Sequence, residues 1–217
     1  SLLKLLRLGG DGTGSGETTP VSENDDSQTL NMPIDAARIL VQRALERCGS
    51  VSGIARSVAD ACIDAQAEGQ DATGFGAAAD YCDALLERRV DGTVVHSTER
   101  PTPVMFRVDA RRGFTHPAFD AEFEELVETT QRFGIALFAL RNGYASGALG
   151  FYVRRLASKG LVGIALANAG PALMAPAGGR QRVFCTNPIA FGAPRSSGYP
   201  LVIDQSTSQA AAVNLRR

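Results

Sequence analysis

The stretch ALRNGYASGALGFYVRRLASKGLVGIALA, residues 139–167, indicates the fold class, because it places one helix between two apolar runs. Ser146–Lys159 has helical spacing of its apolar residues, and Gly160 is a typical stop. The flanking runs Ile135–Leu140 and Leu161–Ala167 are too short for ordinary helices, so we predict two buried strands. Helices interleaved with buried strands are typical of an α/β fold.

Further toward the N-terminus, the pattern predicts helices only. Apolar residues recur at helical spacing over Pro33–Cys48, Ser52–Ala67 and Gly76–Arg89, with glycines at the ends of the first two. We therefore expect residues 32–101 to form an N-terminal helical layer.

The remaining segments predict strands and one more helix. Thr102–Asp109 alternates like a strand, and Pro117–Phe133 returns to helical spacing. Shorter strands are predicted at Val183–Phe184, Ile189–Ala193 and Leu201–Asp204. Residues 102–217 are thus expected to be a mostly β part with flanking helices, which with the helical layer gives an α/β protein.

The first 31 residues have a different composition. Gly9–Asn31 is dominated by small and polar residues, and Val21 and Leu30 are its only aliphatic side chains. Such a segment buries too little apolar surface to offset its ordering entropy, so residues 1–31 are predicted to be a flexible tail or linker. Ser1–Leu8 is apolar but too short for a secretory signal.

Composition narrows the class of partner. The net charge is −1 and the basic residues are scattered, which argues against a nucleic-acid partner. No apolar run reaches the roughly 20 residues of a membrane-spanning helix, so we expect a soluble, cytoplasmic protein that binds a small molecule. The four cysteines lack metal or redox spacing, and with only two histidines no metal site is expected.

From Arg141 onward the chain carries an ordered series of short blocks. They read R-N, G-A-x-G-x-Y, G-x-x-G-x-A, A-P-x-G-G, T-N-P-x-A-F-x-x-P and V-x-D-x-x-T-S. This order resembles the type II malate/L-lactate dehydrogenase family, which includes ureidoglycolate and sulfolactate dehydrogenases, diketogulonate reductase and cyclic-imine reductases. The resemblance extends more weakly back to Met32. It implies a cofactor domain without a Rossmann fold, and no G-x-G-x-x-G follows a predicted strand.

The resemblance also implies a set of cofactor-binding residues for NAD or NADP. Glycines allow close backbone approach, and short polar side chains suit phosphate, ribose or amide groups. Taken singly, each of these residues is more simply explained by turn chemistry. The implied residues are Asn142, Gly147, Asn168, Gly178, Gly179, Thr186, Asn187, Asp204, Gln205 and Ser206.

The positions where the family keeps its catalytic groups are changed. The family's G-x-x-S-H-G signature corresponds to residues 69–74, where Ala72 replaces the Ser and Thr73 replaces the acid His. Ala77 stands where an Arg would bind a substrate carboxylate, and Ala145 replaces a second His. Threonine does not titrate near neutral pH, so it cannot directly replace a general acid.

The candidate catalytic positions are therefore Thr73, Asp71 and Asp204. Asp71 lies next to the vacated position and could act as an acid if it were buried, whereas a solvated loop carboxylate is the simpler interpretation. His116, just before Pro117, is interpreted as structural.

Two functions remain open. The first is an NAD(P)-dependent oxidoreductase that acts on a small 2-keto or 2-hydroxy acid or a cyclic imine. The second is a catalytically degenerate homologue that keeps the scaffold as a binding or partner subunit. Because members of the family are dimers, we expect a homodimer or a complex with a second chain.

Overall fold

The computed structural model describes residues 31–208 of the 217-residue chain. The predicted flexible tail, residues 1–31, lies outside the described residues apart from Asn31. No helix between residues 31 and 208 is long and apolar enough to cross a membrane.

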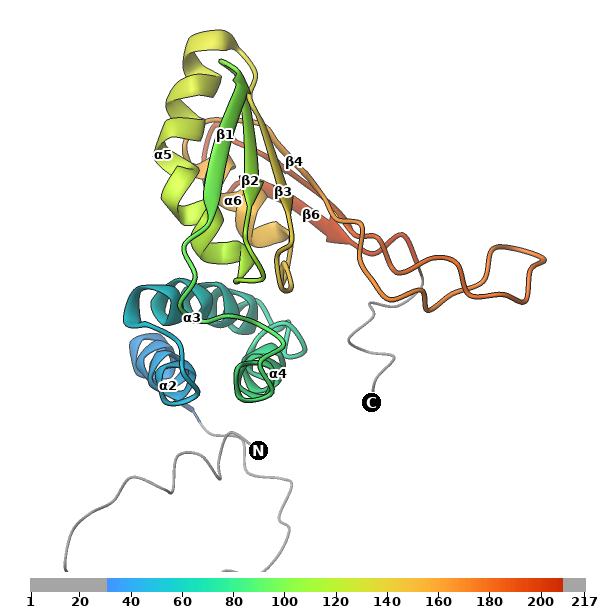
Figure 1. The fold of residues 1–217 in the computed structure, drawn as a ribbon. Coiled ribbons are helices and arrows are strands. Elements are labelled where there is room, and N and C mark those ends of the chain that lie inside the picture. Colours follow the sequence, from blue (N-terminus) through green and yellow to red (C-terminus); the bar gives the residue numbers. More distant parts are fainter. Residues whose placement is uncertain (1–30, 209–217) are drawn as a thin grey trace, which may run out of the picture.

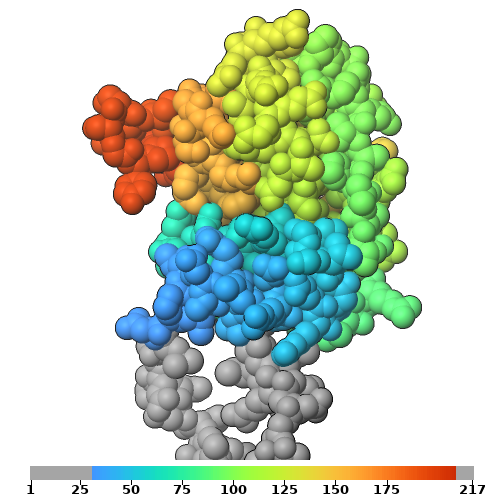
Figure 2. Space-filling view, turned by 90° about the vertical axis from the view of Figure 1, so that its left-hand side faces the viewer, coloured from blue at the N-terminus to red at the C-terminus, as the bar shows by residue number. Residues whose placement is uncertain are grey.

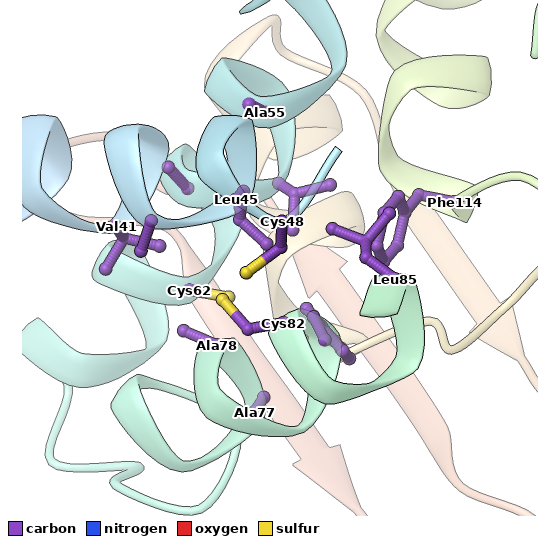
Figure 3. Packing of buried hydrophobic residues seen from close by; sticks show 14 of the residues in the cluster. Val41, Leu45, Cys48, Ala55, Cys62, Ala77, Ala78, Cys82, Leu85 and Phe114 are labelled. Carbon is purple, nitrogen blue, oxygen red and sulfur yellow. The ribbon is translucent and has the colours of Figure 1, made fainter. Parts of the chain in front are cut away.

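Three helices form the predicted N-terminal layer, at the bottom of Figure 1: α2 (Ile34–Arg47), α3 (Ser52–Ala67) and α4 (Phe75–Leu86). Their inward faces repeat every three to four residues, so each helix buries one stripe against the other two. Figure 3 shows the resulting core, in which aliphatic side chains and the thiols of Cys48, Cys62 and Cys82 pack together. All three thiols are buried and unpaired, so they act as small apolar groups.

A first sheet lies above this layer. Its strands are β1 (Ser97–Thr102), β2 (Met105–Asp109) and β3 (Leu137–Arg141), in that order. β1 pairs antiparallel with β2, while β2 and β3 are parallel and are joined through α5 (Thr115–Phe133), which lies alongside the sheet (Figure 1).

A second, antiparallel sheet follows. It consists of β4 (Gly163–Leu166), β5 (Ile189–Ala193) and β6 (Leu201–Gln205), and α6 (Gly150–Ser158) packs on it. The approach is close, since a Cβ on Gly192 of β5 would lie 2.5 Å from the carbonyl oxygen of Val153 in α6. Residues 168–188, between β4 and β5, form an arm that projects from the body (Figure 1).

The two sheets confirm the predicted α/β class without a doubly wound parallel sheet. A second apolar core joins α5, α6 and strands of both sheets. In Figure 2 the helical layer lies beneath this body, and the residues coloured red, toward the C-terminus, protrude to the left. The proposed boundary between a helical part and a cofactor part, at residues 101 and 102, remains a prediction.

One expectation about the strands is wrong. Ile135–Leu140 and Leu161–Ala167 were expected to be buried strands, yet Leu137, Ile164 and Leu166 are 54%, 66% and 72% exposed. The opposite face of each strand does pack, with Phe138 half-buried and Gly163 fully buried. The described residues provide no second layer for the outer faces, so an apolar run alone did not indicate how many faces are covered.

Candidate active site

A cavity of about 1230 Å³ is lined by α4 and the turn before it, by β3 and the loop after it, and by residues of α5, α6, β4 and β6. Segments that are far apart in the sequence therefore contribute to its wall, and most blocks of the family resemblance meet there. The predicted site residues that line it are Thr73, Asn142, Gly147, Asn168, Thr186, Asp204, Gln205 and Ser206.

Four predicted residues do not line the cavity. Gly178 and Gly179 lie on the projecting arm. Asn187 instead uses its side-chain oxygen to accept a hydrogen bond from the Ala169 amide, at 3.2 Å, which ties the two ends of the arm together. Asp71 is exposed and accepts a hydrogen bond from Gln66 at 2.5 Å, so its surroundings are those of a solvated loop carboxylate.

The wall contributed by α4 and the turn before it is weakly polar. The Thr73 hydroxyl donates to Gln70, at 3.1 Å to the side-chain oxygen and 3.3 Å to the backbone oxygen. Ala77, one turn further on, is only 7% exposed and leaves no cation at the position of the family's carboxylate-binding Arg. Arg141 is the one cation among the described lining residues, and it forms an ion pair with Asp109 at 3.1 Å.

The loop between β3 and α6 has the most unusual backbone of the site. Asn142, Ala145 and Gly147 have φ angles of 55°, 49° and 62°, a left-handed conformation that strains a residue with a Cβ. Asn142 is held by its side chain, which donates to Asp109 at 3.0 Å. Such strain is often found at functional sites.

The same loop offers free donors to a ligand. Ser146, Gly147 and Ala148 line the cavity, and their amides form no hydrogen bond with any described residue. They directly precede α6, whose N-terminal end favours negative charge. This donor set fits a phosphate or carboxamide of a nicotinamide dinucleotide, and Gly147 leaves room for close approach.

Asp204 and Thr186 connect the second sheet to this loop. The Gly150 amide donates to the Asp204 carboxylate at 2.7 Å, so Asp204 caps the start of α6 from β6. Thr186 is 4% exposed, and its carbonyl oxygen accepts hydrogen bonds from Ser206 at 3.1 Å and from Thr207 at 2.9 Å. Asp204 and Thr186 line the cavity, and the hydrogen bonds that they accept also fix the position of its wall.

Tyr81, His116 and Tyr152 form a buried group behind Gly147. His116 is 1% exposed and stacks on Tyr152 at a centroid distance of 5.8 Å. Neither of its ring nitrogens has a hydrogen bond of normal geometry. Burial lowers the pKa of His116 to about 4, while Asp120 and the Ser146 backbone oppose the shift. Tyr81 was not singled out from the sequence as a cavity residue, although its spacing of four and eight residues from Ala77 and Thr73 could have indicated this place.

Between residues 31 and 208, no group of three or more His, Cys, Asp or Glu side chains is arranged to hold a metal ion. The polar groups of the cavity are amides, hydroxyls, isolated carboxylates and the guanidinium of Arg141. Their chemistry suits an organic ligand.

Comparison with known proteins agrees with this site. The family model for malate/L-lactate dehydrogenase matches residues 32–217, so the chain belongs to this family. Among curated proteins, it is 35% identical over 187 residues to a Delta(1)-pyrroline-2-carboxylate/Delta(1)-piperideine-2-carboxylate reductase of Pseudomonas syringae pv. tomato, covering 85% of this chain and 53% of that protein. It is 36% identical over 178 residues to a (2R)-3-sulfolactate dehydrogenase (NADP(+)) of Chromohalobacter salexigens, covering 81% and 52%.

Solved structures give the same relationship. The crystal structure of delta1-piperideine-2-carboxylate reductase from Pseudomonas syringae superposes with a TM-score of 0.82 at 33% identity, covering 87% of this chain and 56% of that one. The malate dehydrogenase of Pyrococcus horikoshii gives 0.80 at 26% identity, covering 92% and 56%. The chain thus spans about half the length of the relatives it matches.

Proposed function

We propose that this chain forms the cofactor- and substrate-facing part of an NAD(P)-dependent oxidoreductase that acts on a cyclic imine or a small 2-keto or 2-hydroxy acid. The observation that carries this proposal is the convergence of the family blocks, from residues 73 to 206, on one cavity. The relatives named for reduction of cyclic imine carboxylates and for NADP(+)-linked sulfolactate oxidation support it.

The cofactor would supply or accept hydride at a substrate carbon. This chain's part is to bind and orient both molecules. The unbonded amides of residues 146–148 would hold a polar group of the cofactor, while the wall from α4 would face the substrate. Holding the two at reacting distance lowers the entropic part of the barrier.

Fluorescence titration of the purified chain with NADH and NADPH tests the binding part. The sharpest variant is Ala148→Asp, which places a carboxylate beside the unbonded amides and should weaken binding by at least about tenfold through like-charge repulsion. Ala36→Asp is the matched control, because Ala36 is exposed on α2 and remote from the cavity. Absence of binding to the unmodified chain, or equal binding by both variants, would refute the proposal.

A second candidate is a degenerate homologue that binds without redox turnover. It is favoured by Thr73, which cannot titrate, and by Ala77, which provides no cation. Restoring the family residues with Ala72→Ser, Thr73→His and Ala77→Arg tests this candidate. Turnover that appears only in the restored chain supports it, and robust activity of the unmodified chain contradicts it.

We also infer that the chain pairs with another polypeptide, with a second copy as the first candidate. The exposed apolar faces of β3 and β4, which also line the cavity, support this inference, because large apolar patches and open sheet surfaces favour association. A clean monomer in light scattering at high concentration would count against the pairing.

Four buried free thiols support a reducing compartment such as the cytoplasm.

A further inference from the structure

Tyr81 occupies the last of three cavity-facing positions spaced four residues apart. Thr73 precedes α4, and Ala77 and Tyr81 lie on it, each one turn beyond the last. Residues four apart share a helix face, so all three line the same wall. The first two positions have lost groups that the family uses, while the third carries a hydroxyl with an acidic proton.

The cavity wall contains three tyrosines, and the Tyr81 hydroxyl is the one that forms no hydrogen bond with a described residue. The Tyr144 hydroxyl bonds to Arg89, and the Tyr152 hydroxyl donates to the Ser146 carbonyl at 2.8 Å. No described residue hydrogen-bonds the Tyr81 hydroxyl, although its ring is only 5% exposed and packs on Phe114. The aromatic packing fixes the ring, and the hydroxyl is left available to a ligand.

The buried imidazole of His116 lies near the same position, beside Gly147. A Cβ built on Gly147 would lie 3.8 Å from the Tyr81 hydroxyl and 2.9 Å from Nε2 of His116. His116 is buried, and among the described residues neither ring nitrogen has a hydrogen bond of normal geometry, although the Ser146 backbone interacts with the ring. A buried nitrogen without a hydrogen bond of normal geometry is energetically unfavourable. A polar ligand atom beside Gly147 would satisfy it and would lie next to the Tyr81 hydroxyl.

We propose that Tyr81 is the proton donor of this site, in place of the acid missing at Thr73; this rests on the proposed function. When hydride from reduced nicotinamide reaches the carbon of a C=O or C=N bond, the π electron pair moves to the oxygen or nitrogen. The Tyr81 O–H bond then breaks and its proton goes to that atom, while the phenolate takes a proton from water.

The surroundings of Tyr81 bear on this role in two ways. Burial raises the pKa of Tyr81 well above its usual value, with smaller contributions from Cys62, Tyr152, Tyr144 and Asp80, so the hydroxyl keeps its proton at neutral pH and is a weaker acid than an exposed tyrosine. Of the carboxyl groups in the wall, Asp80 is exposed and Asp204 caps α6. Tyrosine is an established general acid in enzymes. The Tyr81 hydroxyl also lies close to Gly147, in the loop that is proposed to bind the cofactor.

The direct test is ¹³C NMR of the chain labelled at Cζ of its four tyrosines, titrated with oxamate, an unreactive 2-oxo acid analogue, in the presence of NADH or NADPH. Tyr81→Phe assigns the Tyr81 resonance. We expect this resonance to shift on oxamate binding, while that of Tyr199, which is 89% exposed, stays unchanged. An unmoved Tyr81 resonance would overturn the proposal.

Turnover gives the second readout. Tyr81→Phe should lower turnover about 10²- to 10⁴-fold, with nicotinamide affinity changed by less than about twofold. Tyr199→Phe, the matched control, should equal the unmodified chain. Equal turnover in Tyr81→Phe, or no turnover in an unmodified chain that binds both ligands, overturns the donor role alone. Absence of nicotinamide binding removes the proposed function as well, so the two failures are distinguishable.

Discussion

The helical layer and the second sheet contain similarly apolar sequence but bury it very differently. In the layer, Val41, Leu45 and Val58 are fully buried, whereas Ile164 and Leu166 of β4 are 66% and 72% exposed. The helices carry one apolar stripe each, and three such stripes close on one another. β4 is apolar on both faces, and only one face is covered by the residues that the structure describes. An apolar stripe thus indicates which face of a helix is buried, whereas a wholly apolar run does not indicate which faces of a strand are covered.

The largest expected effect is a difference in stability loss between a substitution in the helical layer and one in the second sheet. Leu45→Ala should lower the free energy of unfolding by about 2–5 kcal/mol, because it leaves a cavity in the closed helical core. Ile164→Thr, which keeps a β-branched residue in β4, should change it by less than about 0.5 kcal/mol. Denaturant unfolding of both variants measures the difference. A comparable loss in Ile164→Thr would mean that the outer face of β4 is covered in solution.

The buried His116, between the two regions, gives the stability a pH dependence. Its pKa is about 4 in the folded protein against 6.5 in the reference state, so the unfolded chain binds more protons between these values. The contribution of neutral His116 to the free energy of unfolding is therefore present above pH 6.5. As the pH falls toward 4, up to about 3 kcal/mol of this contribution is lost.

His116→Phe tests this pH dependence, because it keeps an aromatic ring on Tyr152 and removes the titrating nitrogens. Thermal unfolding between pH 7 and pH 4 should show a flatter decline in the variant than in the unmodified chain. Parallel declines would mean that other groups dominate acid unfolding.

A glycine tests how tightly the second sheet is packed on its covered side. Gly192→Ala should cost about 1–3 kcal/mol, because the new Cβ would lie 2.5 Å from the Val153 carbonyl oxygen and force α6 away from β5. Gly53→Ala is the control: it has open space in α3 and should stabilise the helix by about 0.5–1 kcal/mol. Opposite signs in a denaturant series are the expected result, and a neutral Gly192→Ala would contradict the packing.

Elements with a clear period were predictable from sequence. α3 and β5 have the predicted bounds, since α3 carries a helical stripe and β5 is too short for an ordinary helix and lies between turn residues. β1, STERPT, was missed because it is a polar edge strand that hydrogen-bonds only to β2. Its stability comes from pairing with distant residues, which no local pattern reveals.

The site was predictable in part for a similar reason. Motif order identified Gly147, Thr186 and Ser206, and the fold brings them to one cavity. Tyr81 was not singled out and His116 was interpreted as structural, because their importance depends on a shared neighbour, Gly147, far away in sequence. Burial and missing hydrogen-bond partners are three-dimensional facts without a sequence signature.

The smallest expected effect concerns the contact that ties β6 to α6. Asp204→Ala removes the acceptor of the Gly150 amide and a negative charge at a helix N-terminus, which should cost about 1 kcal/mol. Asp204→Asn keeps an acceptor oxygen and loses only the charge, so its cost should be a few tenths of that. Unfolding at low and high salt separates the two contributions, because only the charge term is screened. If Asp204→Asn costs as much as Asp204→Ala and salt does not change it, the carboxylate contributes through packing in the second sheet rather than as a cap.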